Sequence, residues 1–406
     1  MPDLQVDLVV DQLRRAVPGG IGTYCLGLLQ GLRSLPAEDR PAVTLRASRP
    51  IGAARRRDPL AELGVPLRSS LLPGAVLTTL WNRDLPAGWL VPSVRGGTTG
   101  RGARRLVHAS SFAAPPVRRL PLVTMVHDLA WRRFPEAYPP HGRAWHERAL
   151  RLVAKVSSEI VVPSEVTAVD LLAAGLGVRA ERVHVVPEGA DHLAPPDFEA
   201  AAALLERLGL PPGSEYLLTV GTLEPRKNLS RLVEAYGRAR SHLAEPWPLV
   251  VVGPQGWSGG DAALAAGVPG VVAAGPASAG VLSALYARSR CTAYVPVLEG
   301  FGLPAAEAMA AGAPVVATRG LPSVAGAALE VDPFDVEEIA AALVEAATDG
   351  EPRTRLVAAG TARAAMLNWE ACAKAHVAIW AEAAELASER ATPSTGAALD
   401  RGSGGR

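Results

Sequence analysis

Short runs of apolar, often β-branched residues alternate along the chain with longer amphipathic segments. Five of these runs lie in the first half of the chain and five in the second: LQVDLVV, RLVHAS, PLVTMVH, EIVVPS and VHVVPE, then EYLLTVG, PLVVVG, GVVAAG, TAYVPV and PVVAT. Because the runs are apolar throughout, they are typical of parallel strands covered by helices on both faces. The pattern predicts an α/β fold of two doubly wound, Rossmann-like domains that face each other across a cleft.

A Pro-rich segment at Ala194 to Asp197, followed by a helix and then by Leu210 to Gly213, marks the predicted linker between the domains. The last residues are small and polar enough to be disordered. The predicted units are an N-terminal domain, a second domain, a C-terminal helix and a disordered tail, at residues 1–200, 201–368, 369–388 and 389–406. Ligands of open α/β sheets bind beyond the carboxyl ends of the strands, so the loops that follow the strands are where we expect the chemistry.

The first of these loops is rich in glycine, with Gly19, Gly20 and Gly22 between the first predicted strand and an amphipathic segment. Glycines let a ligand approach the backbone, and the helix that follows presents free N–H groups and the positive end of its dipole to a phosphate. The spacing is not GxGxxG, so a plain tight turn is the alternative.

His127 and Asp128 directly follow the predicted strand from Leu122 to Val126. A histidine at this end of a strand can donate a hydrogen bond to a substrate hydroxyl, and an adjacent aspartate can fix its tautomer or bind in its own right. The alternative is that His127 only caps the strand. His141 and His146, in the helical stretch that follows, are interpreted as structural or surface groups.

Two adjacent cations, Arg226 and Lys227, lie between the strand that ends near Gly221 and the next predicted helix. Positive charge at a helix N-terminus is unfavourable because that end already carries a partial positive charge, so we expect an anion to bind there. The diphosphate of a sugar nucleotide becomes more negative as the glycosidic bond breaks, and the two cations would then stabilise the transition state preferentially. A solvated basic pair is the alternative.

The most specific motif is EGFGLPAAE, in which Glu299 and Glu307 flank a turn that leads into a helix. Both carboxylates can face one side of the cleft and accept hydrogen bonds from the paired hydroxyls of a sugar or ribose, while backbone amides of residues 300–303 contact the same ligand. A general acid/base pair is the rival interpretation of two carboxylates, and helix capping is the alternative for Glu307.

Taken in this order, the glycine-rich loop, the His-Asp pair, EPRKN and EGFGLPAAE resemble the retaining glycosyltransferases of family 4 (group 1), which have the two-domain GT-B fold. The resemblance covers about residues 4–388. It implies a nucleotide-sugar donor domain at the C-terminal end, an acceptor domain at the N-terminal end, and a C-terminal helix that packs back on the latter. Many relatives have Gly-Arg where this chain has Gly221-Thr222, and Arg226 is interpreted as the replacement for that arginine.

The resemblance also implies a role for each motif. His127 would contact the transferred sugar near its reacting carbon, Arg226 and Lys227 would hold the diphosphate, Glu299 would bind the donor sugar, and Glu307 the ribose. Contacts with the acceptor are implied for Gly19 and Asp128. Further contacts with the donor are implied for glycines and backbone amides of the loops: Gly20, Gly22, Gly221, Gly300, Phe301, Gly302 and Leu303.

The reaction implied by the resemblance is transfer of a hexose from a nucleoside diphosphate sugar to an acceptor hydroxyl, with retention and therefore an α-linkage. EPRKN and VHDLAWRRFPE resemble the mannosyltransferase-like branch and favour GDP-mannose over UDP-sugars. The chain contains no DxD motif, so we expect no metal and no cofactor beyond the sugar-nucleotide co-substrate. A glycan, a lipid-linked saccharide, a phospholipid and a soluble metabolite all remain open as acceptors.

Three other classes share parts of the pattern. A GT-B sugar-nucleotide epimerase would bind the same donor but would need catalytic carboxylates in the N-terminal domain. An inverting natural-product glycosyltransferase would need an N-terminal His-Asp pair as base and a different donor motif. A non-catalytic sugar-nucleotide binder would keep Glu299, Glu307 and Lys227 but lose His127; this chain has all four, which favours an enzyme.

Charge adds an asymmetry that the net value of +1 conceals. Residues 1–200 hold 25 basic and 19 acidic side chains, a balance of +6, and residues 201–406 hold 16 and 21, a balance of −5. Ten arginines in loop-like sequence contribute to the excess: Arg55, Arg56, Arg57, Arg101, Arg104, Arg105, Arg118, Arg119, Arg132 and Arg133. We expect the N-terminal half to face an anionic partner such as a membrane surface or lipid phosphate, with ordinary solvated arginine as the alternative, and we expect no nucleic acid.

The cysteines and the hydropathy of the sequence are used to predict the cellular compartment of the protein. The three cysteines match neither a CxxC metal pattern nor an even-numbered disulfide framework. No apolar run reaches the roughly 18 residues of a membrane span, and the N-terminus has acids where a signal peptide has a basic region. These features predict a cytoplasmic protein, with any membrane contact peripheral and on the inner face.

Overall fold

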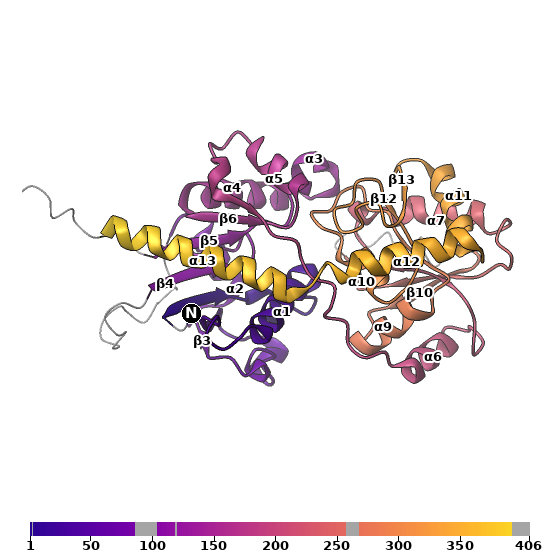
Figure 1. Cartoon of the computed structure of the whole chain (residues 1–406), viewed down its shortest axis with the longest axis horizontal. Helices are drawn as coiled ribbons and strands as arrows, with labels where there is room; N and C mark the ends of the chain where they lie inside the picture. The colour runs from indigo at the N-terminus through magenta and orange to yellow at the C-terminus, as the bar shows by residue number, and fades with distance from the viewer. Residues whose placement is uncertain (2, 86–103, 118–119, 257–267, 392–406) are drawn as a thin grey trace, which may run out of the picture.

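Two α/β lobes lie side by side along the long axis of the molecule (Figure 1). The computed structural model describes residues 1, 3–85, 104–117, 120–256 and 268–391. Each lobe is built on one parallel sheet, and all ten predicted strands are present. The prediction of a two-domain α/β fold is therefore confirmed.

The N lobe contains a seven-stranded sheet in the order β3-β2-β1-β4-β5-β6-β7. Its strands are β1 Leu4–Val9, β2 Ala42–Ala47, β3 Leu67–Ser69, β4 Arg104–Ala109, β5 Leu122–Met125, β6 Glu159–Val162 and β7 Val183–Val185. Its helices are α1 Gly19–Ser34, α2 Gly74–Trp81, α3 Ala130–Arg133, α4 Pro140–Val156 and α5 Glu165–Leu172, with short 3-10 turns η1 Asp11–Arg14, η2 Gly52–Arg55, η3 Ala61–Leu63, η4 Pro135–Ala137 and η5 Ala180–Arg182.

The C lobe contains a six-stranded sheet in the order β10-β9-β8-β11-β12-β13. Its strands are β8 Leu217–Val220, β9 Leu249–Val252, β10 Val271–Gly275, β11 Cys291–Tyr294, β12 Val315–Thr318 and β13 Leu329–Val331. Its helices are α6 Phe198–Arg207, the turn η6 Pro225–Lys227, α7 Leu229–Ala239, α9 Ala279–Arg288, α10 Leu303–Ala310, α11 Val336–Ala347 and α12 Glu351–Ala365. In both sheets the order of the strands reverses beside the first strand, between β1 and β4 in the N lobe and between β8 and β11 in the C lobe. The loops at the carboxyl ends of the strands beside such a switch point form binding sites.

Side chains at the start of several helices explain where those helices begin. Ser164, Asp197, Ser278 and Asp335 each accept a hydrogen bond from a backbone N–H in the first turn, which satisfies one of the free donors there. Asp197 thereby starts α6, whose buried Ala201 belongs to the C-lobe core. The chain thus enters the C lobe at Asp197, slightly before the predicted boundary at residue 200.

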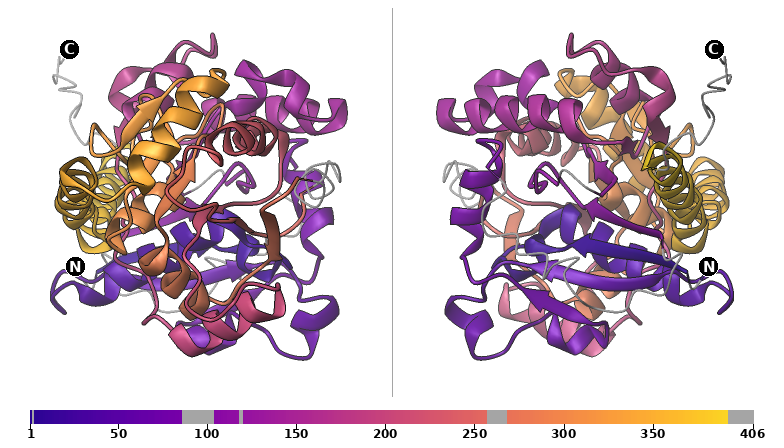
Figure 2. Two further views of the ribbon diagram at one scale, coloured as in Figure 1. Left: turned by 90° about the vertical axis from the view of Figure 1, so that its right-hand side faces the viewer. Right: turned by 90° about the vertical axis from the view of Figure 1, so that its left-hand side faces the viewer.

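The long helix α13, Trp369–Ala391, leaves the C lobe and packs on α1 and β4 of the N lobe (Figure 1). In both end-on views it lies along one side of the molecule (Figure 2). The predicted disordered tail began at residue 389, but the helix continues to Ala391; residues 392–406 lie outside the described part of the chain. The sequence of α13 is rich in alanine, which favours helix.

Trp369, the first residue of α13, is fully buried in a slot formed by Gly27, Gly31 and Gly189, called here the glycine slot. A Cβ atom at Gly27 would lie 2.0 Å from the indole ring, and one at Gly31 would lie 2.0 Å from the Trp369 carbonyl oxygen. The absence of side chains at these positions lets the indole ring reach the backbone of α1. The slot therefore fixes α13 to the N lobe at its first residue.

A buried hydrogen-bonded chain holds the middle of α13. The indole Nε1 of Trp380 donates to Nδ1 of His108 at 3.2 Å, so Nε2 of His108 carries the ring proton and donates to the Tyr24 hydroxyl at 2.9 Å. Tyr24 in turn donates to Nε2 of His376 at 2.8 Å, and Nδ1 of His376 donates to the Cys372 carbonyl at 2.8 Å. Every member has a partner, and both histidines are neutral.

This neutrality predicts a loss of stability in acid. Burial lowers the pKa of His376 to about 4 and that of His108 well below its usual value. Histidine in the unfolded chain titrates near 6.5, so below that pH the unfolded chain binds more protons than the folded protein. The free energy of unfolding therefore falls as the pH decreases from about 6.5 to about 4, by about 3 kcal/mol for His376 alone.

The measurement is thermal unfolding between pH 7 and pH 4.5. Acidic side chains contribute to any such profile, so His376→Gln serves as the comparison: it is expected to lose less stability over this range than the wild type. His242→Gln, at an exposed histidine of the C lobe, serves as the control and should follow the wild type. Parallel profiles for the wild type and His376→Gln would contradict the assignment.

Many arginines of the basic N-terminal half are already paired. Five of the ten singled out from the sequence form ion pairs with nearby acids: Arg57, Arg104, Arg105, Arg132 and Arg133. Arg101, Arg118 and Arg119 lie outside the described residues. These ion pairs leave the net balance of +6 unchanged, but the paired arginines are neutralised locally and contribute little to a positive surface patch; an anionic partner stays a prediction. Within the described ranges, no helix is long and apolar enough to cross a bilayer.

Candidate active site

The lobes meet where the loop after β11 contacts the loops after β5 and β6. The Ser164 hydroxyl donates to the Gly300 carbonyl at 2.6 Å. A Cβ atom at Gly300 would lie 1.7 Å from the His127 carbonyl oxygen, so only glycine allows this approach. The EGFG turn of the C lobe is thus in direct backbone contact with the predicted His-Asp loop of the N lobe.

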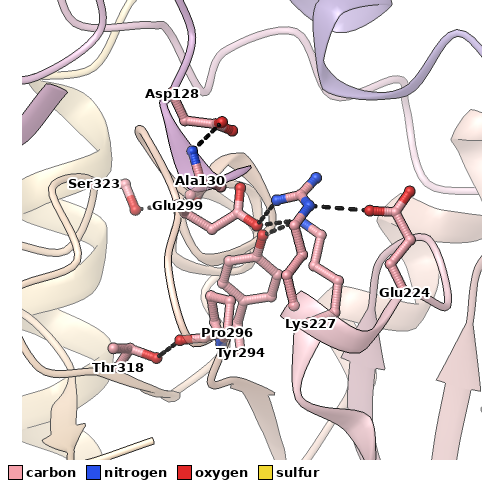
Figure 3. A network of polar contacts seen from close by, with 11 residues as sticks. Asp128, Ala130, Glu224, Lys227, Tyr294, Pro296, Glu299, Thr318 and Ser323 are labelled. Atoms are coloured by element: carbon pink, nitrogen blue, oxygen red, sulfur yellow. Dashed lines mark hydrogen bonds and ion pairs between the residues drawn. The ribbon is translucent and has the colours of Figure 1, made fainter. Parts of the chain in front are cut away.

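Glu299 is the centre of a buried charge cluster (Figure 3). Its Oε1 atom forms ion pairs with the Arg226 guanidinium and, at 2.5 Å, with Nζ of Lys227. The Lys227 ammonium also donates to the Tyr294 hydroxyl at 2.7 Å, and Nε of Arg226 lies 3.0 Å from Oε2 of Glu224. Sequence reasoning predicted that the two cations need an anion, and in this structure the side chain of Glu299 occupies that position.

The cluster keeps its charges despite burial. Burial alone raises the pKa of Glu299, but the positive charges of Arg226 and Lys227 more than offset it, and the pKa is lowered. Burial, with Arg226 beside it, lowers the pKa of Lys227. The two cations lie in the turn η6, before α7 begins at Leu229, and so occupy a loop instead of the first turn of the helix.

Both ring nitrogens of His127 face hydrogen-bond acceptors. Nε2 lies 2.9 Å from the Ser110 carbonyl oxygen, and Nδ1 lies 3.3 Å from Oε1 of Glu188. Burial lowers the pKa of His127, but Glu188 outweighs burial and the pKa is raised. Two acceptors favour a ring that is protonated on both nitrogens, and in this arrangement neither nitrogen of His127 is free to act as a base.

Of the two roles considered for Asp128, orienting His127 belongs to another residue, while a contact of Asp128 with the acceptor stays a prediction. Asp128 accepts a hydrogen bond at 3.0 Å from the backbone N–H of Ala130, the first residue of the short helix α3, and the ring nitrogens of His127 face Ser110 and Glu188 instead (Figure 3). Glu188, buried just after β7, holds that position instead. The rule that singled out His127, a polar residue beyond the carboxyl end of a strand, also applies to Glu188.

Glu307 lies near the middle of α10 and is held by two neutral donors. The Tyr286 hydroxyl donates to Oε2 at 2.9 Å, and Nε2 of His192 lies 2.9 Å from Oε1. Tyr286 is in α9 of the C lobe, while His192 belongs to the segment that leaves the N lobe. Sequence reasoning missed His192; the signal available was its place in EGADH, after the strand that ends at Val185.

The predicted glycine-rich loop is largely helix. The helix α1 begins at Gly19, whose φ is 59°, so Gly20 and Gly22 lie in its first turns. A Cβ atom at Gly22 would lie 2.3 Å from Cβ of Pro18, which gives this glycine a packing role, whereas one at Gly20 would lie 3.9 Å from the Leu303 side chain of the C lobe. Glycine has low helix propensity, and contact with α13 overrides that preference here.

The other loop residues surround the charge cluster. Phe301 and Leu303 are buried in a cluster that includes N-lobe residues, and Gly302 has φ 99° and precedes α10. A Cβ atom added at Gly221 would lie 3.8 Å from the aliphatic carbons of Lys227, so this glycine adjoins the Lys227 side chain. The structure thus brings the residues predicted from four separate motifs to one junction between the lobes. Within the part of the chain described, no group of three His, Cys, Asp or Glu side chains is arranged to hold a metal ion.

Two Rossmann-like lobes that join a buried Arg-Lys pair to the EGFGLPAAE turn define a glycosyltransferase of the GT-B class. The family profile described as Glycosyltransferase Family 4 matches residues 18–192, and the profile described as Glycosyl transferases group 1 matches residues 202–363. The chain belongs to glycosyltransferase family 4, group 1, as the sequence motifs predicted, and is an enzyme of that kind.

Individual relatives agree with this assignment. D-inositol 3-phosphate glycosyltransferase of Xylanimonas cellulosilytica is 30% identical over 413 aligned positions, which cover 92% of this chain and 94% of that protein. O-antigen chain mannosyltransferase B of Escherichia coli is 29% identical over 290 residues, covering 66% of this chain and 71% of that protein. Among solved structures, Anabaena Alr3699/HepE in complex with UDP and glucose superimposes with a TM-score of 0.63 at 20% identity, covering 95% of this chain and 99% of that one.

Proposed function

We propose that the protein is a retaining hexosyltransferase that moves a hexose, with mannose from GDP-mannose favoured, to an acceptor hydroxyl in α-linkage without a metal ion. The observation that carries the proposal is the buried cluster of Arg226, Lys227 and Glu299 at the lobe junction. The mannose preference is supported by the likeness to O-antigen chain mannosyltransferase B of Escherichia coli and by further relatives named mannosyltransferases.

The charge cluster suits a diphosphate leaving group. As the bond between the anomeric carbon and the phosphate oxygen breaks, the diphosphate gains negative charge, so its attraction to Arg226 and Lys227 grows toward the transition state. Glu299 keeps both cations in place before the donor binds. Its free carboxylate lone pairs can accept hydrogen bonds from hydroxyls of the donor sugar.

The proton arrangement at His127 favours retention by front-face displacement. A doubly protonated His127 cannot remove the acceptor proton, which argues against an inverting reaction with histidine as base. In the proposed step, the acceptor oxygen bonds to the anomeric carbon on the face that the diphosphate leaves. The acceptor proton passes to the departing phosphate oxygen, so no protein base is needed, and the imidazolium charge of His127 adds to the positive field.

The test is to incubate the purified protein with GDP-mannose, UDP-glucose and UDP-N-acetylglucosamine, with and without EDTA, and to follow release of nucleoside diphosphate. Acceptors include mannosides and D-inositol 3-phosphate, because the relative from Xylanimonas cellulosilytica carries the latter in its name. We expect the fastest release from GDP-mannose, no effect of EDTA, and an α-anomeric product by NMR.

Each outcome bears on a different part of the proposal. Turnover of none of the donors would overturn the transferase assignment for these substrates. Faster release from a UDP-sugar would overturn only the donor preference, a β-linked product would overturn retention, and inhibition by EDTA would overturn the metal-free reaction.

A further inference from the structure

His192 links α13 to the proposed donor site. It lies at the end of the segment that leaves the N lobe, and its side chain is 17% exposed, between the indole of Trp369 and the carboxylate of Glu307. The two residues just before it are tied to the start of α13. The Ala190 N–H donates to the Leu367 carbonyl at 2.8 Å, and the Trp369 N–H donates to Oδ1 of Asp191 at 2.8 Å.

The hydrogen bonds fix which nitrogen of His192 carries the proton. The indole N–H of Trp369 can only donate, and it lies 3.1 Å from Nδ1 of His192, so Nδ1 accepts. The ring proton of neutral His192 is therefore on Nε2, which donates to Oε1 of Glu307 at 2.9 Å. The other tautomer would place a lone pair of Nε2 against the carboxylate. Trp369 cannot shift to release this arrangement, because the glycine slot encloses it.

Glu307 is thereby oriented from both lobes by neutral donors. The Tyr286 hydroxyl from the C lobe occupies one lone pair of Oε2, and His192 occupies one lone pair of Oε1. Each oxygen keeps a second lone pair, and two hydroxyls on neighbouring carbons of a ribose can donate to the two oxygens of one carboxylate. Neutral donors fix the direction of the carboxylate and leave its negative charge for these hydroxyls.

We propose that His192 is a positioning residue for Glu307: with its tautomer set by Trp369, it holds the carboxylate from the N-lobe side for the ribose of a nucleoside diphosphate. The proposal rests on the proposed function and on the role that the family resemblance implies for Glu307, which is to bind the ribose of the donor. It assigns a part of donor recognition to a residue of the opposite lobe. It also makes α13, through its first residue, a support of the donor site as well as of the N-lobe core.

The test measures how strongly the protein distinguishes ribose from deoxyribose. Calorimetry gives the affinity of the full chain for GDP and UDP and for their 2′-deoxy and 3′-deoxy analogues. For the wild type we expect the loss of at least one of the two hydroxyls to weaken binding about tenfold, the usual effect of losing one hydrogen bond to a charged group. In His192→Leu this ratio is expected to fall toward one, because the carboxylate is no longer held.

Two variants separate positioning from folding. His192→Gln places an amide N–H close to the position of Nε2 and is expected to restore most of the ratio. His184→Leu removes another histidine–glutamate contact, that of His184 with Glu159 at 2.9 Å on β7 and β6, and is expected to leave the ratio unchanged. Thermal unfolding of each variant reports folding separately from the ratio.

The outcomes distinguish this inference from the function on which it rests. A wild type that binds none of the nucleotides would overturn the proposed function, and this inference with it. A wild type that binds and discriminates, with a His192→Leu variant that discriminates equally well, would overturn the role of His192 and leave the proposed function intact. A change of the ratio in His184→Leu as large as in His192→Leu would also overturn it.

Discussion

Replacing Lys227 by methionine is expected to lower kcat by about 10²- to 10³-fold, the usual effect of removing one charge-stabilising donor from an active site. Methionine keeps most of the length of the side chain and removes its charge and its N–H donors. The ammonium lies 2.5 Å from Glu299 and the Lys227 side chain is only 15% exposed, so few water molecules screen its attraction to a departing diphosphate. The loss should appear mainly in kcat, since the attraction increases as the leaving group becomes more negative.

The measurement is nucleoside diphosphate release at saturating donor, together with KM and thermal unfolding. Lys155→Met is the matched control, because this lysine is 70% exposed and pairs with Asp84 away from the site; its kcat should equal that of the wild type. A Lys227→Met enzyme with wild-type kcat would refute the role given to the charge cluster. An unchanged unfolding midpoint would show that a loss of activity is chemical in origin.

The second large effect is expected for Gly27→Ala, which should destabilise the N lobe by about 2–3 kcal/mol, as overpacking of a core does. The new methyl group would lie 2.0 Å from the indole ring of Trp369, and neither the ring nor the backbone of α1 has room to move away. Because Trp369 also orients His192, we expect weaker nucleotide binding in the same variant.

A matched glycine makes this prediction specific. Gly237 lies within α7 and no heavy atom lies within 4 Å of the position of an added Cβ, so Gly237→Ala should stabilise the C lobe by about 0.5–1 kcal/mol. Thermal unfolding of both variants, followed by circular dichroism, provides the comparison. Equal midpoints for Gly27→Ala and the wild type would mean that the glycine slot is looser than described.

Local pattern predicted the sheets well because central parallel strands are buried on both faces and are therefore apolar throughout. The strands it missed, β2, β3 and β13, lie toward the edges of the sheets, where burial is incomplete and polar residues enter. The residues of EPRKN and EGFGLPAAE come together because they follow β8 and β11, which are neighbours in the C-lobe sheet. The same edge rule placed His127 at the lobe junction.

Partnerships between distant segments could not be predicted in the same way. Glu188 pairs with His127, 61 positions earlier, and Trp369 meets His192 across 177 positions. The hydrophobic pattern within one segment does not indicate which distant segment it will contact, because these contacts depend on how loops of different elements pack. The helical start of α1 was missed because glycine has low helix propensity, while α1 packs through Gly27 and Gly31 on Trp369, more than three hundred residues away.

The cysteines of this chain have a practical consequence for measuring whether the two lobes move relative to each other. All three are free and buried, and burial raises the pKa of Cys25 and Cys291 to about 12 and that of Cys372 well above its usual value. Maleimide dyes react with exposed thiolates, so the native protein offers them little to attack. A cysteine introduced at Val169 in α5, which is 60% exposed, and another at Gly237 in α7 would each carry a label in an otherwise unreactive background. Energy transfer between the two dyes would then test, molecule by molecule, whether the distance between the lobes changes when a nucleotide binds.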